Sequence, residues 1–270
     1  MPKTLSAFGL FLAGVLALSV LLWPKASPLY AQTGTPGAAT PPARASDWIR
    51  IDTVQVKPEM WNQYREIERD EVIPALRKAG VPSRAAWRTA EFGTTYEIVL
   101  VRPVPDFADY DGGDALTKGM GARDAERLRE RIRRCLVSRE SAALLVRSDL
   151  GAGEIGRPFA VVTTLTVAPG RNEDYEAFLR ETLPQVRKAG VIYGAYQRVY
   201  GQSTAWLLVQ NLDSLRELTR GPAGVSTAFP EADAERRIRG LTGIVTSVER
   251  KVFRFDPELS FSFPGPAPSP

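Results

Sequence analysis

The chain has 270 residues, of which 44% are hydrophobic and 24% charged, a globular composition long enough for two domains of roughly 100 to 150 residues. Its formal net charge is only +4, with arginines interleaved among acidic residues, so nucleic-acid binding is not expected. It contains no histidine, which excludes a Ser-His-Asp or Cys-His nucleophile, a histidine-ligated haem and a histidine-bearing zinc site.

Residues 1–31 have the pattern of a signal peptide. Lys3 precedes an uncharged apolar run from Leu5 to Trp23, and Ala31 stands before Gln32, where a signal peptidase would cut. The run has 19 residues, enough to cross a bilayer, so an uncleaved anchor stays open as the alternative. We therefore expect a periplasmic or secreted protein that meets a membrane only if the segment is retained. Residues 32–46, rich in Pro, Gly and Thr, are expected to form a flexible spacer.

The rest of the chain repeats itself about 110 residues further on. The stretch "RKAGV" occurs at 77–81 and 187–191, and "WRTAEFGTTYEIVLV" from position 87 aligns with "QRVYGQSTAWLLVQN" from position 197. Because such matches recur in the same order along the chain, we infer a tandem duplication. It predicts a first repeat at 47–150, a linker at 151–156, a second repeat at 157–260 and a disordered tail at 261–270.

Both repeats predict the same elements in the same order. A β-branched, alternating segment at 48–56 or 159–167 is typical of a strand, and an amphipathic helix follows it. Two strands around a glycine-containing hairpin, a helical segment beginning "DAER", and a last strand through 141–147 or 249–255 complete the unit. The order β-α-β-β-α-β is that of a ferredoxin-like half, with both helices on one face of the sheet.

The first helix of each repeat contains a proline, Pro74 or Pro184, and we expect a kink just before it. Tyr64 and Pro74 are ten positions apart, whereas Tyr175 and Pro184 are nine apart. The two helices therefore differ by one residue.

A sheet with both helices on one face leaves its other face bare, and placing two such sheets face to face closes a barrel. On its element order, its proline-containing first helix ending in "RKAG" and its aromatic-rich third strand, the chain resembles the dimeric α+β barrel superfamily. It is most similar there to the NIPSNAP-like and EthD-like groups, beside the antibiotic-biosynthesis monooxygenases. The resemblance covers 47–150 and 157–260, and implies an α+β fold of two ferredoxin-like repeats packed sheet to sheet as a pseudo-dimer within one chain.

Two apparent chemical motifs are better explained structurally. Cys135 is the only cysteine and aligns with the apolar Ile244, so we expect a buried thiol rather than a reactive or metal-binding one. "GAGEIG" at 151–156 has the letters of a dinucleotide fingerprint, but a strand follows where that motif needs a helix. The sequence thus predicts neither a metal site nor a bound cofactor.

The candidate ligand site lies on strand faces that would meet inside the barrel. Because side chains alternate along a strand, Arg88 should share a face with Ala86 and Ala90, and Arg198 with Tyr196 and Tyr200. Tyr96 aligns with Trp206, and Thr53 and Gln55 align with Thr164 and Thr166. An inward orientation would suit a planar or anionic molecule, bound by the candidates Arg198, Tyr196, Tyr200, Trp206, Arg88 and Tyr96. The alternative is that each arginine sits at a barrel mouth and pairs with a glutamate such as Glu91 or Glu97.

Three functions stay open. We favour an exported small-molecule-binding protein without catalysis, its ligand planar or anionic. The resemblance implies the second, a cofactor-independent monooxygenase or an EthD-like degradative enzyme; without histidine, it would use Tyr, Trp, Asn or Arg on an acidic phenolic substrate. The third is a structural or interaction module. No catalytic residue is assigned, and a homo-oligomer stays open.

Overall fold

The structure is a computed structural model that describes residues 47–151, 156–201, 204–221 and 224–262. The expected signal peptide and spacer, 1–31 and 32–46, lie outside the described residues, as do 152–155 of the expected linker. Among the described residues, no helix is both long enough and apolar enough to span a bilayer.

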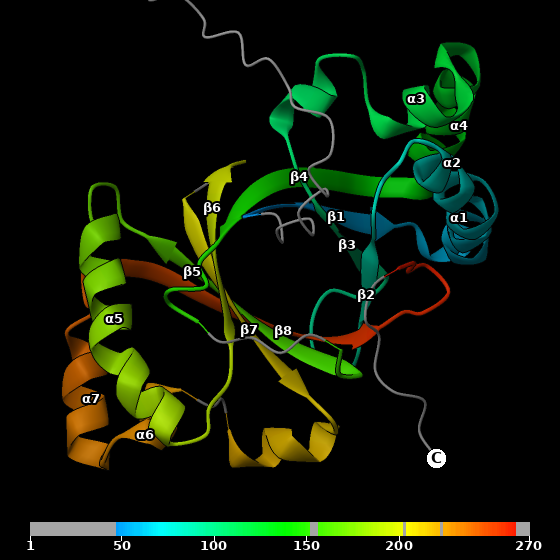
Figure 1. The fold of residues 1–270 in the computed structure, drawn as a ribbon. Helices are drawn as coiled ribbons and strands as arrows, with labels where there is room; N and C mark the ends of the chain where they lie inside the picture. The colour runs from blue at the N-terminus through cyan, green and yellow to red at the C-terminus, as the bar shows by residue number, and fades with distance from the viewer. Residues whose placement is uncertain (1–46, 152–155, 202–203, 222–223, 263–270) are drawn as a thin grey trace, which may run out of the picture. The chain divides into compact units, whose positions relative to one another are not determined.

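Eight strands form one closed barrel in the order β1-β3-β2-β8-β5-β7-β6-β4, and every neighbouring pair is antiparallel (Figure 1). The strands are β1 (Trp48–Val56), β2 (Ala85–Thr89), β3 (Glu97–Pro103), β4 (Leu136–Val146), β5 (Phe159–Val167), β6 (Gly194–Tyr200), β7 (Ala205–Leu212) and β8 (Val245–Phe255). This confirms the mixed α+β class and the closed barrel. Within each half, the spatial order of the strands is fourth, first, third, second, and the halves join where β2 pairs with β8 and β6 pairs with β4. Descent of the halves from one duplicated ferredoxin-like unit stays a prediction.

Helices cover the barrel from outside, in one group for each half (Figure 1). The first half has η1 (Pro58–Met60), α1 (Trp61–Ile67), η2 (Glu68–Val72), α2 (Ile73–Lys78), η3 (Phe107–Tyr110), α3 (Ala115–Met120) and α4 (Ala122–Cys135). The second has α5 (Asn172–Lys188), η4 (Leu215–Arg220), α6 (Val225–Ala228) and α7 (Glu231–Arg239). Each group buries a hydrophobic core against its own sheet. Cys135 is buried in the first of these cores, as expected, and burial raises the pKa of its thiol.

Each half sends the segment after its last strand onto the other half. Beyond β4, the Arg147 amide donates to the Ala195 carbonyl at 2.9 Å, and Leu150 is fully buried in the core of the second half. Beyond β8, the Asp256 amide donates to the Ala86 carbonyl at 2.9 Å, and Leu259 is fully buried in the core of the first half. The exchange is reciprocal, so each core is completed by a leucine from the other half.

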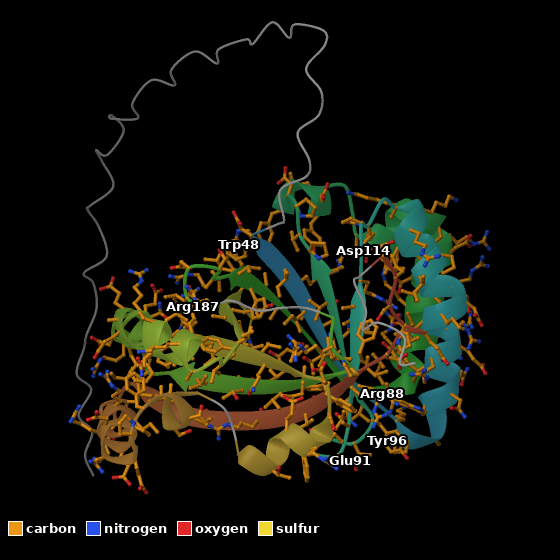
Figure 2. The ribbon with its side chains drawn as sticks, turned by 60° about the horizontal axis from the view of Figure 1, so that its bottom comes forward. Trp48, Arg88, Glu91, Tyr96, Asp114 and Arg187 are labelled. Atoms are coloured by element: carbon orange, nitrogen blue, oxygen red, sulfur yellow. The ribbon has the colours of Figure 1, made fainter. Side chains whose placement is uncertain are left out.

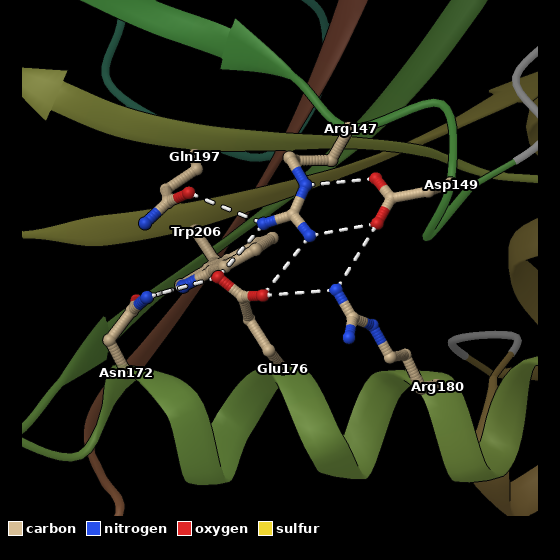
Figure 3. A network of polar contacts seen from close by, with 7 residues as sticks. All are labelled: Arg147, Asp149, Asn172, Glu176, Arg180, Gln197 and Trp206. Carbon is tan, nitrogen blue, oxygen red and sulfur yellow. Dashed lines mark hydrogen bonds and ion pairs between the residues drawn. The ribbon is translucent and has the colours of Figure 1, made fainter.

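Equivalent ion pairs anchor both crossing segments, but their charges are reversed. In the first half Arg65 of α1 pairs with Asp256. In the second half Glu176 of α5 pairs with Arg147, whose Nη1 lies 2.8 Å from Glu176 Oε1 and whose Nε lies 2.8 Å from Asp149 Oδ1 (Figure 3). Equivalent positions in the two halves therefore carry ion pairs in which the acidic and basic partners are exchanged.

The extra residue in the first helix is taken up by a π-helical turn. The turn η2 separates α1 from α2 just before Pro74, at the place where the spacing from Tyr64 showed the insertion, and it buries Glu68. Arg84 Nη1 donates to Glu68 Oε2 at 2.7 Å, and its Nε and Nη2 donate to the Leu259 carbonyl at 3.1 and 2.9 Å. In the second half, α5 runs as one α-helix through Pro184.

Two predicted boundaries need correction. Phe261, placed in the disordered tail of 261–270, is buried in the first core, and its amide and carbonyl both bond to Arg84. Residues 263–270 lie outside the described residues. The last strands begin five and four residues before the predicted segments, at Leu136 and Val245.

The packing of α3 on α2 predicts that Gly119→Ala destabilises the protein. A Cβ at Gly119 would fall 2.1 Å from the carbonyl oxygen of Ala75, so the backbone has to shift. We expect a loss of about 1–3 kcal/mol in the free energy of unfolding, measured by urea denaturation. In the control Gly112→Ala, the new Cβ would meet only a Lys118 carbon at 3.7 Å, and the change should stay within about 0.5 kcal/mol. Equal effects of the two substitutions would contradict the close approach.

The reciprocal exchange predicts equal importance for two distant leucines. Leu150→Ala and Leu259→Ala should each lower the free energy of unfolding by about 2–5 kcal/mol, because each leaves a cavity in the core of the opposite half. Ile238→Ala, on an exposed face of α7, is the control and should change it by less than about 0.5 kcal/mol. If either leucine behaves like Ile238 in chemical denaturation, the crossing segment does not hold the fold together.

Candidate functional site

The barrel interior has an apolar part and a polar part. Ile49 of β1, Val162 of β5 and Leu207 of β7 pack in one cluster although these strands belong to opposite halves, so their side chains point inward. By alternation Thr53, Gln55, Thr164 and Thr166 face inward as well, in agreement with the prediction.

Arg198 reaches into this interior from β6. It pairs with Leu144 of β4 and Ala205 of β7, and its side chain is only 18% exposed. Its Nη1 donates to Glu140 Oε1 at 3.2 Å, while its buried Nε finds no hydrogen-bond partner among the described residues. An unsatisfied buried donor on a cation is costly and invites an acceptor.

Tyr196 lies two positions before Arg198 and packs in the inward apolar cluster. Its ring folds back over Gly194, where a Cβ would lie only 2.9 Å from the ring carbon Cε2. Glycine at 194 therefore gives the ring its place along the strand. Burial raises the pKa of the Tyr196 hydroxyl, so it remains a neutral donor at physiological pH.

A second ion pair inside the barrel was missed by the sequence reasoning. Lys251 of β8 donates to both carboxylate oxygens of the buried Glu97 on β3, at 3.0 and 3.2 Å. Gln55, beside Glu97, donates to the Thr95 carbonyl at 2.7 Å, but its buried Oε1 accepts from none of the described residues. The alternation of Lys251 with Phe253 was the available signal. Among the described residues, no three Cys, Asp or Glu side chains gather in a way that could hold a metal ion.

Tyr200 does not lie with Arg198. A β-bulge interrupts the pairing of β6 with β4, so that Arg198 pairs with Leu144 but Tyr200 with Ala143. A bulge shifts the alternation by one residue, and Tyr200 turns to the outer face. There it is 61% exposed and stacks on Trp48, with 5.9 Å between ring centroids.

Trp206 also lies outside the barrel, beneath α5. It pairs with Gln197, on the face opposite Arg198, and is fully buried. Its Nε1 donates to Asn172 Oδ1 at 2.8 Å, and the Arg147 guanidinium lies 5.4 Å from its ring centroid (Figure 3). This tryptophan belongs to the anchoring network of the second half.

The structure separates Arg88 from Arg198 as well. In the first half, Arg88 of β2 pairs with Ile98 of β3, and Ile98 pairs with Val54 of β1. In the second half, the corresponding row of paired residues is Gln197, Trp206 and Leu165. The register thus makes Arg88 the equivalent of Gln197, whereas the sequence alignment matched it with Arg198. This shift of one residue moves the side chain from the inner face of the sheet to the outer face. Arg88 is therefore outside, 41% exposed and 3.9 Å from Asp256.

Tyr96 precedes β3 at the barrel end remote from Trp48, together with Arg88 and Glu91 (Figure 2). It has a φ of 61°, is 37% exposed and packs edge-on against Trp61. The glutamate pairing considered for the arginines occurs for Arg198, whose partner is Glu140, whereas Glu97 pairs with Lys251 and Glu91 is exposed. Of the six predicted ligand residues, the structure brings together only Arg198 and Tyr196.

No protein-family model and no curated protein sequence matches the chain. Solved structures do. An anthrone oxidase-like protein superposes with a TM-score of 0.55 at 13% identity, over 79% of this chain and 93% of its own. A protein of Fusobacterium nucleatum, provisionally assigned as a monooxygenase, superposes with a TM-score of 0.50 at 14% identity, over 78% and 93%.

These neighbours correct the favoured function. A binding protein without catalysis was expected, but both structures carry the names of oxidising enzymes, which favours the enzyme alternative. The NIPSNAP-like and EthD-like assignment is not supported by them. At such low identity the likeness concerns the fold alone, which is a closed eight-stranded α+β barrel.

Proposed function

We propose that this protein is an oxidoreductase that oxidises a planar, acidic phenolic molecule with dioxygen, without a bound cofactor. The observation that carries the proposal is Arg198, a mostly buried cation inside the barrel whose Nε has no partner among the described residues. A fold shared with an anthrone oxidase-like protein and a monooxygenase-type protein supports oxidation as the reaction class.

In this proposal each inward side chain has a distinct role. Arg198 binds the oxyanion that forms when the substrate loses a proton, and a charged donor in a water-poor site stabilises that anion strongly. Glu140, 3.2 Å from Arg198, is the carboxylate that accepts the proton. The neutral Tyr196 hydroxyl donates a second hydrogen bond, and its ring offers a stacking face.

The chemistry balances with dioxygen as the only oxidant. An activated methylene beside a phenolic ring loses a proton, and the resulting carbanion passes electrons to dioxygen. One oxygen atom becomes the new carbonyl oxygen and the other leaves as water, so that CH₂ and O₂ become C=O and H₂O. The protein contributes the stabilised anion and the exclusion of water from it.

Two finer inferences accompany this proposal. We infer that the halves arose from one duplicated ferredoxin-like unit, which their common strand order and reciprocal crossing segments support. We also propose export through residues 1–31, because the sequence pattern supports a signal peptide. N-terminal sequencing of the native protein should find Gln32 first; an intact Met1 in the membrane fraction would favour the anchor.

Oxygen consumption with anthrone as the probe tests the reaction. The purified protein should consume one O₂ per anthrone oxidised. Arg198→Gln should lower kcat/KM by about 10- to 150-fold, the range for losing a hydrogen bond to a charged group. Tyr196→Phe keeps the ring and should have a smaller effect.

Arg88→Gln is the matched control, since Arg88 is a strand arginine on the outer face, and it should leave kcat/KM within about twofold. Circular dichroism of each variant separates loss of activity from loss of fold. The proposal fails if wild type does not exceed the uncatalysed rate, or if folded Arg198→Gln and Arg88→Gln behave alike.

A further inference from the structure

We propose a second ligand site on the outer face of the first half, where Arg102 lines a pocket that takes a small monocarboxylate with an apolar body. The pocket, of about 170 Å³, lies between the turn after α2, the end of β3 and the segment from η3 to α3.

Arg102 lies in this pocket without a carboxylate partner among the described residues. Among the described residues its side chain makes one hydrogen bond, from Nη2 to the Tyr110 hydroxyl at 3.3 Å, and no ion pair. Its guanidinium lies 5.7 Å from the Tyr110 ring centroid, and that of Arg50 lies 5.9 Å from the same centroid. Two arginines thus flank one aromatic ring.

The nearby carboxylate is already saturated. Asp52 is buried and accepts from Arg50 Nη2 at 2.9 Å, lies 3.1 Å from Arg139 Nη2, and also accepts from Ser141. Three arginines therefore share a single carboxylate in this cluster. Burial first, and then the charges of Arg50 and Arg139, lower the pKa of Arg102, and the opposing effects of Tyr110 and Asp52 offset this only in part.

The remaining pocket lining selects the kind of anion. Apolar groups of Val81, Pro103 and Ala115 suit a hydrocarbon body. The carboxylates of Asp106 and Asp109 oppose a second negative charge on the ligand. A single carboxylate can use the guanidinium fork in a bidentate arrangement.

The remaining polar groups of the pocket are engaged locally. The Asp106 carboxylate accepts from the Ala108 amide at 2.9 Å, and Lys118 Nζ donates to the Asp109 carbonyl. Lys118 has no ion pair among the described residues either, so an incoming carboxylate would meet two cations, of which only Arg102 offers a bidentate fork.

This site is independent of the proposed oxidation. Arg102 follows Val101 on β3 and pairs with Arg50, whereas Val101 pairs with the inward Ile51. Arg102 and the barrel interior consequently lie on opposite faces of the same sheet. Loss of one site should leave the other intact.

Isothermal titration of the full chain with sodium benzoate tests the proposal, with benzamide as the uncharged isostere and inorganic phosphate as the alternative anion. Benzoate should bind with unit stoichiometry and raise the melting temperature, and benzamide and phosphate should bind at least about tenfold more weakly. Arg102→Gln should weaken benzoate binding at least about tenfold. Arg102→Lys keeps the charge but loses the fork, and should fall between wild type and Arg102→Gln.

Arg254→Gln is the matched control, because Arg254 is also an outer-face strand arginine over an aromatic ring, 4.8 Å from the Phe159 centroid. It should bind benzoate within about twofold of wild type. Equal binding of benzoate and benzamide, or of wild type and Arg102→Gln, would overturn the site. Phosphate binding as tight as benzoate would overturn the monocarboxylate assignment. Should Arg102→Gln fail to fold, the benzamide comparison and Arg102→Lys still decide.

Discussion

The barrel depends on one constraint: the last strand of each half must pair with a strand of the other half. Alone, each four-stranded sheet would leave two open edges with unpaired backbone groups, β4 and β2 in the first half and β8 and β6 in the second. Pairing β8 with β2 and β4 with β6 removes all four edges. The chain beyond each strand then carries Leu259 or Leu150 into a core that lacks it. Neither half is complete by itself, because the hydrophobic core of each half needs a leucine from the other.

Charge makes the two crossings different from each other. Arg65 receives the acidic Asp256, whereas Glu176 receives the basic Arg147, so each segment would meet a like charge at the other's position. In the first half this polarity is extended by the buried pair of Arg84 and Glu68. Burying two charges costs desolvation, which good geometry and the additional bonds to the Leu259 carbonyl offset. The π-helical turn, which has no counterpart in α5, places Glu68 for this contact.

The same asymmetry reaches the barrel interior. Trp87 and Tyr196 occupy equivalent positions, because Trp87 pairs with Val99 beside Thr53, and Tyr196 with Leu207 beside Thr164. Trp87 packs edge-on against Phe255 in an apolar corner, while Tyr196 accompanies Arg198 and Glu140. The interior therefore carries Trp87, Phe255 and the Lys251–Glu97 pair on one side, and Tyr196 with the Arg198–Glu140 pair on the other.

The strands 48–56 and 159–167 were readable from the sequence, because alternation and β-branching are local properties that both repeats display. The inward Thr53 and Thr164, the buried Cys135 and the one-residue insertion were readable for the same reason. The faces of Arg88, Tyr200 and Trp206 were not. Alternation determines which residues share a face only within an uninterrupted strand of known register, and register is set by hydrogen bonds to partner strands far along the chain. A slip between β2 and β6 reassigned Arg88, and a bulge at the end of β6 reassigned Tyr200. The register of β7 against β6 placed Trp206 beside Gln197, on the outer face. The sequence alone therefore determined the elements and their repetition, whereas the tertiary pairing decided which arginine enters the barrel.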